Sequence, residues 1–190
     1  MNAPGFVPRS IRRSAYRMIG RHWRDWYGSK KPVIGYAFRF LCVIVGLYAI
    51  SITKMYDTVV NQATFIIAKV THELIHLLGG GSTLSGATLE SGGSAVLTVV
   101  PLCTAFDYVW FLIATITAFP ARPARKVLGV VVGIAALLIL NVLRVSSLFW
   151  VGIRFPQHFA IVHEQVWALL LNCSTISLVV AWLVWIKRTG

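Results

Sequence analysis

Polar side chains that can do chemistry are few in this 190-residue sequence, and most of them stand at the ends of long apolar stretches. Such side chains are costly inside an apolar stretch, so each one is a candidate functional residue. Two of them open one stretch, two close the next, and two open the last: Cys103 and Asp107, Asn141 and Arg144, and His163 and Glu164.

A thiol, a guanidinium and an imidazole together suffice for acyl transfer. The thiolate of Cys103 is the nucleophile, and a nearby cation, either Arg144 or protonated His163, increases the reactive fraction. Arg144 can also bind a carbonyl oxygen as it becomes an oxyanion. His163 can protonate a leaving amine and later deprotonate the acceptor. Each residue also has a simpler explanation. Cys103 could be a small packing residue, Arg144 could extend its charged end to the lipid headgroups, and His163 could be an ordinary hydrated side chain.

A second set of residues suggests metal chemistry. His72-Glu73-Leu-Ile-His76 matches H-E-x-x-H, in which two histidines on one helical face bind zinc beside a glutamate base. A catalytic zinc needs a third protein ligand. The available side chains stand in no recognised follow-on motif: Glu90, Asp107, His158, His163 and Glu164.

The composition limits the class of protein that holds these residues. Hydrophobic residues make up 57% of the chain and charged residues 13%, and the mean hydropathy is +0.73. These values disfavour a soluble enzyme and a disordered chain, and they predict an all-α integral membrane protein. The length leaves room for a single membrane domain, residues 1–190, without a soluble domain beside it.

Four apolar stretches have about the length that crosses a hydrocarbon core, roughly 17–25 residues. They are predicted transmembrane helices at residues 33–53, 102–119, 127–151 and 166–186. Residues 1–31 carry many arginines and lysines and one acid, Asp25, with apolar residues at three- and four-residue intervals. This pattern predicts a basic amphipathic helix in the headgroup layer.

The basic clusters indicate the orientation of the chain. The net charge is +12, with clusters at the N-terminus, at residues 122–126 and at Lys187-Arg188. Placing all three in the cytoplasm fits four crossings, so residues 54–101 and 152–163 are expected to face outward. The segment Asp57–Leu78 is only moderately apolar, and we expect a helix on the outer face.

The outward segment is predicted to lead directly to the thiol. A Gly-rich stretch, residues 79–94, breaks the outer helix, and residues 82–89 and 95–100 could form a small hairpin before Pro101. Cys103 and Arg144 each lie about 20 residues, roughly 30 Å of helix, from the 122–126 turn. His163 lies about 24 residues before Lys187, roughly 36 Å. The three side chains are therefore expected at one level, near the outer face.

Three sequence segments resemble the exosortase/archaeosortase family of membrane transpeptidases. They are Pro101-Leu-Cys103-Thr-Ala-Phe, Asn141-Val-Leu-Arg144-Val and the outward His163, and the likeness covers roughly residues 80–186. The family's proposed catalytic set is a Cys in a C-[ST]-G-like motif, an Arg in an N-x-x-R-like motif and a downstream His. This set carries over to Cys103, Arg144 and His163, with Asn141, Asp107 and Glu164 as supporting residues. Ala105 stands where the family usually has Gly, and the short chain is similar to the compact exosortase H type.

The resemblance implies an enzyme of the cytoplasmic membrane whose active site faces outward. Its substrates would be exported proteins that end in a short motif, a transmembrane helix and a basic tail. The enzyme would hold the cleaved protein as a thioester on Cys103 and pass it to an acceptor. Neither a cofactor nor nucleic acid is expected, and membrane lipids are the other partner.

Two alternatives remain beside this interpretation. One is an intramembrane zinc protease that uses His72, Glu73 and His76, and the other is a non-enzymatic membrane scaffold. Cys42 and Cys173 lie inside apolar runs and are expected to be buried and inert. His158 could exchange roles with His163, which we favour because it begins a helix and has Glu164 beside it.

Overall fold

The computed structural model describes residues 31–92 and 95–189. The predicted amphipathic segment, residues 1–31, therefore lies almost wholly outside the described residues. The chain divides into two compact units, residues 1–39 and 40–190. The first unit is described only as the beginning of the helix Lys31–Ile50.

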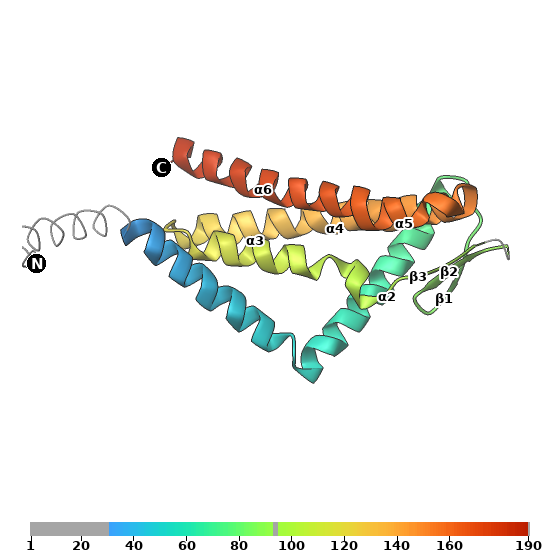
Figure 1. Cartoon of the computed structure of the whole chain (residues 1–190), viewed down its shortest axis with the longest axis horizontal. Helices are drawn as coiled ribbons and strands as arrows, with labels where there is room; N and C mark the ends of the chain where they lie inside the picture. Colours follow the sequence, from blue (N-terminus) through green and yellow to red (C-terminus); the bar gives the residue numbers. More distant parts are fainter. Residues whose placement is uncertain (1–30, 93–94, 190) are drawn as a thin grey trace, which may run out of the picture. The chain divides into compact units, whose positions relative to one another are not determined.

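The second unit holds the remaining elements, which Figure 1 labels. In chain order they are α2 (Lys54–Leu77), β1 (Thr83–Ser85), β2 (Thr88–Ser91), β3 (Ala95–Thr98), η1 (Pro101–Thr104), α3 (Phe106–Ala118), α4 (Pro123–Arg154), η2 (Pro156–His158), α5 (Phe159–Ile161), η3 (Val162–Val166) and α6 (Trp167–Thr189).

Three helices in the described part of the chain are long and apolar enough to cross a membrane. They are Lys31–Ile50, Pro123–Arg154 and the continuous helix Pro156–Thr189. The chain is therefore an all-α membrane protein with one small sheet. The helix expected at residues 102–119 differs, because η1 and α3 share that stretch and α3 has 13 residues. At 1.5 Å per residue α3 spans about 20 Å, which is less than the roughly 30 Å of a hydrocarbon core.

The helix α2 begins where the Thr53 side chain accepts a hydrogen bond from the backbone N–H of Tyr56. It ends before Gly79, whose φ of +78° suits a residue without a Cβ. Its buried residues recur every three or four positions: Val60, Thr64, Ile67, Ala68, Thr71 and Ile75. This stripe packs against α4, while Asp57 and Glu73 remain exposed.

The helices α3, α4 and α6 lie side by side (Figure 1) and share one apolar core. Two glycines of α4 permit the close approach. A Cβ on Gly129 would lie 2.4 Å from the indole of Trp182, and one on Gly133 would lie 2.7 Å from Leu112. Small residues serve the same purpose at many helix interfaces in membranes.

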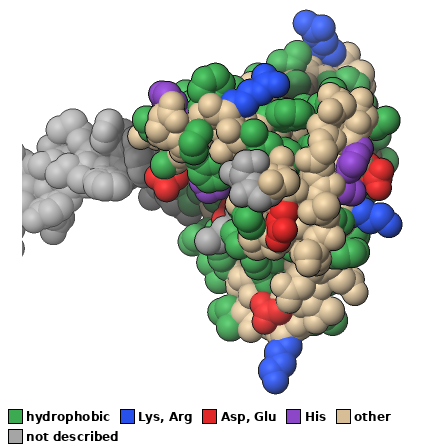
Figure 2. Space-filling view, turned by 90° about the vertical axis from the view of Figure 1, so that its right-hand side faces the viewer, with side chains coloured by type: hydrophobic (Ala, Val, Ile, Leu, Met, Phe, Trp, Pro, Cys, Tyr) green, Lys and Arg blue, Asp and Glu red, His purple; other side chains and the backbone are tan. Residues whose placement is uncertain are grey.

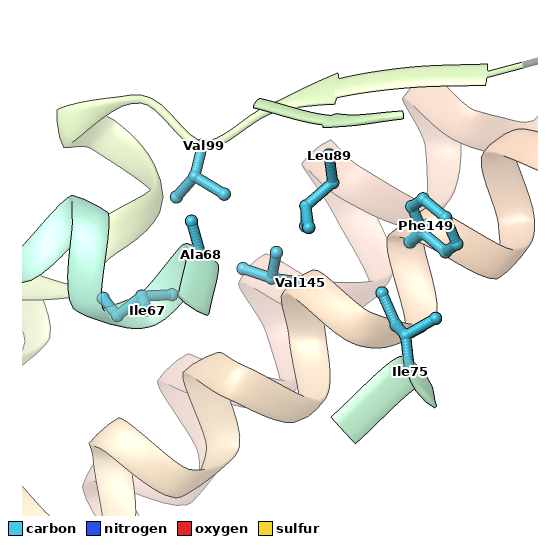
Figure 3. Close-up of a cluster of buried hydrophobic side chains, with 7 residues drawn as sticks. All are labelled: Ile67, Ala68, Ile75, Leu89, Val99, Val145 and Phe149. Atoms are coloured by element: carbon cyan, nitrogen blue, oxygen red, sulfur yellow. The ribbon is translucent and has the colours of Figure 1, made fainter. Parts of the chain in front are cut away.

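A three-stranded antiparallel sheet in the order β1-β2-β3 replaces the expected single hairpin. The sequence predicted that residues 82–89 pair with 95–100, whereas β2 lies between the other two strands and pairs with both β1 and β3. Figure 3 shows Leu89 and Val99 pointing from the sheet toward Val145 and Phe149 of α4 and Ala68 of α2. Because apolar residues alternate along the short strands, one face of the sheet is apolar, and this face packs on the helices.

The basic 122–126 turn and the end of α6 lie at the same end of the bundle. Lys126 Nζ donates to the carbonyl of Thr117 at 2.7 Å, and Arg125 donates to the carbonyls of Ile186 and Thr189. The indole N–H of Trp182 donates to the carbonyl of Arg125 at 3.0 Å. The sheet lies at the opposite end of α4 (Figure 1).

The other two cysteines differ from expectation. Cys42 and Cys173 are exposed on the surface of the chain instead of being buried in its interior. Both lie in helices long enough to span a membrane, so the apolar runs around them present a surface suited to lipid. Neither contributes to a core cluster.

Candidate active site

Cys103, Arg144 and His163 meet at the end of α4 that lies beside the sheet. Cys103 Sγ lies 3.9 Å from His163 Nε2, and Arg144 Nη2 lies 3.1 Å from the same nitrogen. The three residues come from η1, α4 and η3, so the structure brings together the set that the sequence placed at one level.

The backbone around Cys103 is a tight turn. Pro101 opens η1, the Cys103 N–H donates to the carbonyl of Val100 at 2.7 Å, and the buried Thr104 hydroxyl donates to the carbonyl of Pro101 at 2.6 Å. Ala105 then adopts a left-handed conformation, with φ 58° and ψ 19°. This residue ends the 3₁₀ turn and lets α3 begin in a new direction.

Asn141 fixes the turn to α4. Its Nδ2 donates to the carbonyl of Cys103 at 2.7 Å, and the side chain is fully buried. Asn141 and Arg144 are three residues apart, so they lie on the same face of the helix. One face of α4 therefore holds the backbone of Cys103 and supplies the guanidinium.

Arg144 does not reach toward headgroups. Only 9% of the residue is exposed, and its terminal nitrogen points at His163. Its Nε is buried and has no hydrogen-bond partner among the described residues. An arginine that merely snorkels keeps its charged end in water, so this placement favours a role inside the site.

His163 lies inside the continuous helix Pro156–Thr189, whereas the sequence predicted that it begins a helix. It is part of a single π-helical turn, Val162–Val166, and such turns are frequent at functional sites. Its ring stacks on Phe159, with centroids 5.8 Å apart and an interplanar angle of 6°. The spacing of four residues on a helix could have indicated this contact.

A link between α4 and α6 lies one turn from the histidine. The indole N–H of Trp167 donates to Ser147 Oγ at 2.9 Å, and that hydroxyl donates to the carbonyl of Arg144 at 2.8 Å. Nothing in the sequence pattern signalled this pair. It holds the helix of His163 beside the helix of Arg144.

The hydrogen bond from Arg144 determines which nitrogen of the imidazole carries the proton. A guanidinium only donates, so His163 Nε2 accepts, and the neutral ring carries its proton on Nδ1. The lone pair of Nε2 also faces Cys103 Sγ. This nitrogen is therefore in position to take the proton of the thiol.

The three side chains line a cavity of about 310 Å³. Its other walls are β3 and the residues that follow it, Leu148 of α4 and Phe159 of α5. Figure 2 looks onto the sheet end of the molecule, where acidic and histidine side chains lie among hydrophobic ones. The cavity thus combines a thiol, an imidazole and a guanidinium with mainly apolar walls.

One comparison with known proteins gives a match. Residues 33–176, about three quarters of the chain, match the transmembrane exosortase family, designated Exosortase_EpsH. The chain belongs to the transmembrane exosortase family. Searches of curated proteins and of solved structures give no match. Exosortase membership makes the chain a membrane transpeptidase in general terms, and its compact size is consistent with the matched family.

The other predicted site residues of this exosortase lie outside the cavity of Cys103. Asp107 is exposed, accepts a hydrogen bond from the Tyr48 hydroxyl at 3.5 Å, and lines a different cavity beside α2. Glu164 and His158 are exposed, and the His158 ring lies edge-on to Phe155. The structure therefore brings His163 to the thiol and leaves His158 outside.

The two histidines of the H-E-x-x-H motif contact Ser82, the residue before β1. His72 Nδ1 lies 2.8 Å from Ser82 Oγ, and His76 Nε2 lies 3.0 Å from the carbonyl of Ser82. A carbonyl only accepts, so His76 Nε2 carries a proton and has no lone pair for a metal. Within residues 31–92 and 95–189, no three His, Cys, Asp or Glu side chains are grouped closely enough to hold one ion. The residues do not fit the third-ligand requirement of a catalytic zinc.

Proposed function

We propose that the chain is a cysteine-dependent transpeptidase that cleaves the C-terminal sorting signals of exported proteins through a thioester on Cys103. The observation that carries the proposal is the convergence of Cys103, Arg144 and His163 on one cavity. Each of the three supplies a function that acyl transfer requires.

The first half-reaction forms the thioester. His163 Nε2 takes the proton of Cys103 Sγ, and the thiolate attacks the carbonyl carbon of the scissile amide. Arg144 donates hydrogen bonds to the oxygen as it becomes negative. The C–N bond then breaks, and the protonated His163 gives its proton to the leaving amine.

The second half-reaction returns the thiol. An acceptor nucleophile enters the cavity, His163 takes its proton, and the acceptor attacks the thioester carbonyl. The C–S bond breaks and the sulfur regains a proton from the histidine. The substrate chain leaves bonded to the acceptor, with all three side chains in their starting states.

The geometry suggests how the substrate starts this cycle. In the free enzyme Arg144 occupies the Nε2 lone pair of His163 at 3.1 Å, while the thiol lies 3.9 Å away. A substrate carbonyl offers the guanidinium a new acceptor. When Arg144 turns to that carbonyl, Nε2 becomes free for the proton of Cys103.

The positions of the basic residues support an orientation in the membrane. Arg122, Arg125 and Lys126 lie at the end of α4 opposite to the cavity, together with the C-terminal Lys187. Basic residues are retained on the cytoplasmic side. The cavity then opens at the outer face of the cytoplasmic membrane, where a motif preceding a substrate's transmembrane helix emerges.

Hydroxylamine tests the proposal, because it attacks thioesters. The substrate is an exported protein of the same genome that ends in a shared motif, an apolar helix and a basic tail. We expect membranes with the enzyme and hydroxylamine to release this protein with a C-terminal hydroxamate, detected by mass spectrometry. Release of only the free carboxylate, together with loss of cleavage on adding a chelator, would contradict the proposal and favour a metalloprotease.

A further inference from the structure

The strand β3 forms one edge of the sheet, and its outer side carries unpaired backbone groups. The register pairs Leu97 with Leu89 and Val96 with Glu90, and the Val99 N–H donates to the carbonyl of Ala87 at 2.9 Å. In an antiparallel ladder, hydrogen-bonded and non-hydrogen-bonded pairs alternate.

The alternation settles which groups point outward. Since Val99 bonds to Ala87, Leu97 and Ala95 also bond to β2, and the backbone N–H and C=O of Val96 and Thr98 point away from it. No further strand pairs with β3 among the described residues. Two residues of the edge therefore offer a donor and an acceptor each.

The cavity of the site runs along this edge. Its wall includes five consecutive residues, 96–100, whose side chains point to both faces of the strand. A cavity can touch residues of both faces when it follows the edge of a strand. Cys103 lies in the same wall, just beyond the strand.

A second cavity continues the first away from the thiol. It measures about 270 Å³ and shares Val96, Leu97, Leu148 and Phe159 with the first. Gly152 and Pro156 form part of its far wall. The two cavities make one apolar groove between β3 and α4, with the thiol at one end, and we call it the edge groove.

We propose that the edge groove binds the substrate as an extended peptide that pairs with β3 as a fourth strand. The proposal rests on the proposed function, because it concerns the segment next to the bond that Cys103 attacks. Backbone hydrogen bonds to Val96 and Thr98 supply affinity and register. An extended chain leads from this pairing directly to the thiol, where its next carbonyl meets Arg144.

The pairing also predicts a sequence preference. Alternate side chains of a strand point to one face. Those of the bound segment that face the groove meet Leu148 and Phe159, so they are apolar, and the residues between them are unrestricted by this wall. The partner is therefore an extended segment with apolar residues at every second position beside the scissile bond.

Thr98→Pro tests the pairing in the full-length enzyme. Proline removes the outward N–H and keeps the ladder to β2, since proline is tolerated on edge strands. We expect KM for the sorting-signal substrate to rise about tenfold, the effect of one lost hydrogen bond, with little change in kcat. Leu84→Pro removes the outward N–H of the other edge strand, β1, and serves as the control. Because Leu84 also packs on the core, the control is read in enzyme that is alkylated at Cys103 at the wild-type rate. Its KM should stay near the wild-type value.

Alkylation of Cys103 by iodoacetamide reports whether each variant keeps its site intact. A Thr98→Pro enzyme that is alkylated at the wild-type rate and also cleaves with wild-type KM would overturn the pairing. Cleavage lost in Cys103→Ala under the same conditions would still support the proposed function, so the two failures are distinguishable.

Cross-linking gives a second measurement that does not depend on proline. In a variant with Cys42, Cys103 and Cys173 replaced by Ala, Val96→Cys supplies a single exposed thiol. Cysteines are placed one at a time in the substrate segment before the cleavage point. Strand pairing predicts disulfides at every second substrate position. Equal cross-linking at all positions, or a period of three to four, would contradict it.

Discussion

Arg144 and Cys103 both face one nitrogen of His163, and this sharing defines the chemistry available at the site. Only one donor can use the lone pair of Nε2 at a time. The buried guanidinium holds the ring in one tautomer, and the stacked Phe159 holds its plane. In the proposed mechanism, the departure of Arg144 frees Nε2 for the proton of the thiol.

Arg144→Lys separates this role from that of a membrane anchor. Lysine keeps the charge but lacks the planar pair of donors that can serve His163 and a carbonyl oxygen. Loss of one oxyanion donor typically lowers kcat about 100- to 1,000-fold, and we expect a loss in this range. The measurement is the fraction of substrate cleaved in membranes at matched enzyme level. Cleavage at the wild-type rate would show that Arg144 is only an anchor.

Ala105 is the one non-glycine residue with positive φ in the described part of the chain. A left-handed alanine costs about 1–2 kcal/mol, part of which glycine regains by having no Cβ. We therefore expect Ala105→Gly to raise the free energy of unfolding by about 1 kcal/mol, measured by denaturant titration in detergent. Ala135→Gly on the exposed face of α4 is the control, and there glycine should be destabilising by about 1 kcal/mol. A destabilising effect at both positions would mean that the turn needs the alanine methyl.

Among the helices and strands, hydropathy predicted the long helices but not the local turns between and within them. The runs at residues 127–151 and 166–186 are predominantly apolar, so their helices could be recognised directly. The break at Ala105 could not be read from hydropathy, because alanine is a good helix former. The π turn around His163 and the strand β1 likewise depend on tertiary contacts.

The three candidate residues of the active site could also be predicted from the sequence. Helical rise per residue converts spacing into depth, so Cys103, Arg144 and His163 could be placed at one level. The direction in which each side chain points around its helix could not be predicted from spacing. This direction decides that His163 faces the thiol while His158 does not. The exposure of Cys42 and Cys173 has the same origin, since depth alone does not tell a lipid-facing residue from a core residue.

The packing of α4 against α6 depends on a missing side chain. A Cβ on Gly129 would lie 2.4 Å from Trp182, whose indole N–H is held by the carbonyl of Arg125. The ring has little freedom to move, so Gly129→Ala should lower the free energy of unfolding by about 1–3 kcal/mol. The measurement is thermal unfolding in detergent. Gly46→Ala is the matched control, because nothing lies within 4 Å of its added methyl; equal destabilisation of both variants would refute the close contact.

The larger unit, residues 40–190, has two chemically distinct ends. One end carries the basic turn and the C-terminus, and the other carries the sheet, the cavity and the trio. The segment α2 packs along α4 without being among the helices apolar enough to span. The proposed orientation places the basic end in the cytoplasm and the cavity at the outer face of the membrane.

Reporter fusions test that orientation. A reporter active only outside the cytoplasm should be silent after Lys126 or Gly190 and active after Gly92, because the basic clusters are retained inside. Activity after Lys126 would mean that α2 crosses the membrane. In that case the cavity would lie on the other side, away from an emerging sorting signal.

Cleavage by enzymes that differ only in their cysteines tests the role of Cys103 most directly. We compare Cys103→Ala with a variant that keeps Cys103 and has Ala at positions 42 and 173. The measurement is the fraction of a sorting-signal protein cleaved in membranes, with enzyme level checked by immunoblot. We expect no cleavage without Cys103 and near-normal cleavage when Cys103 is the sole cysteine. Full cleavage by Cys103→Ala would contradict the thioester mechanism.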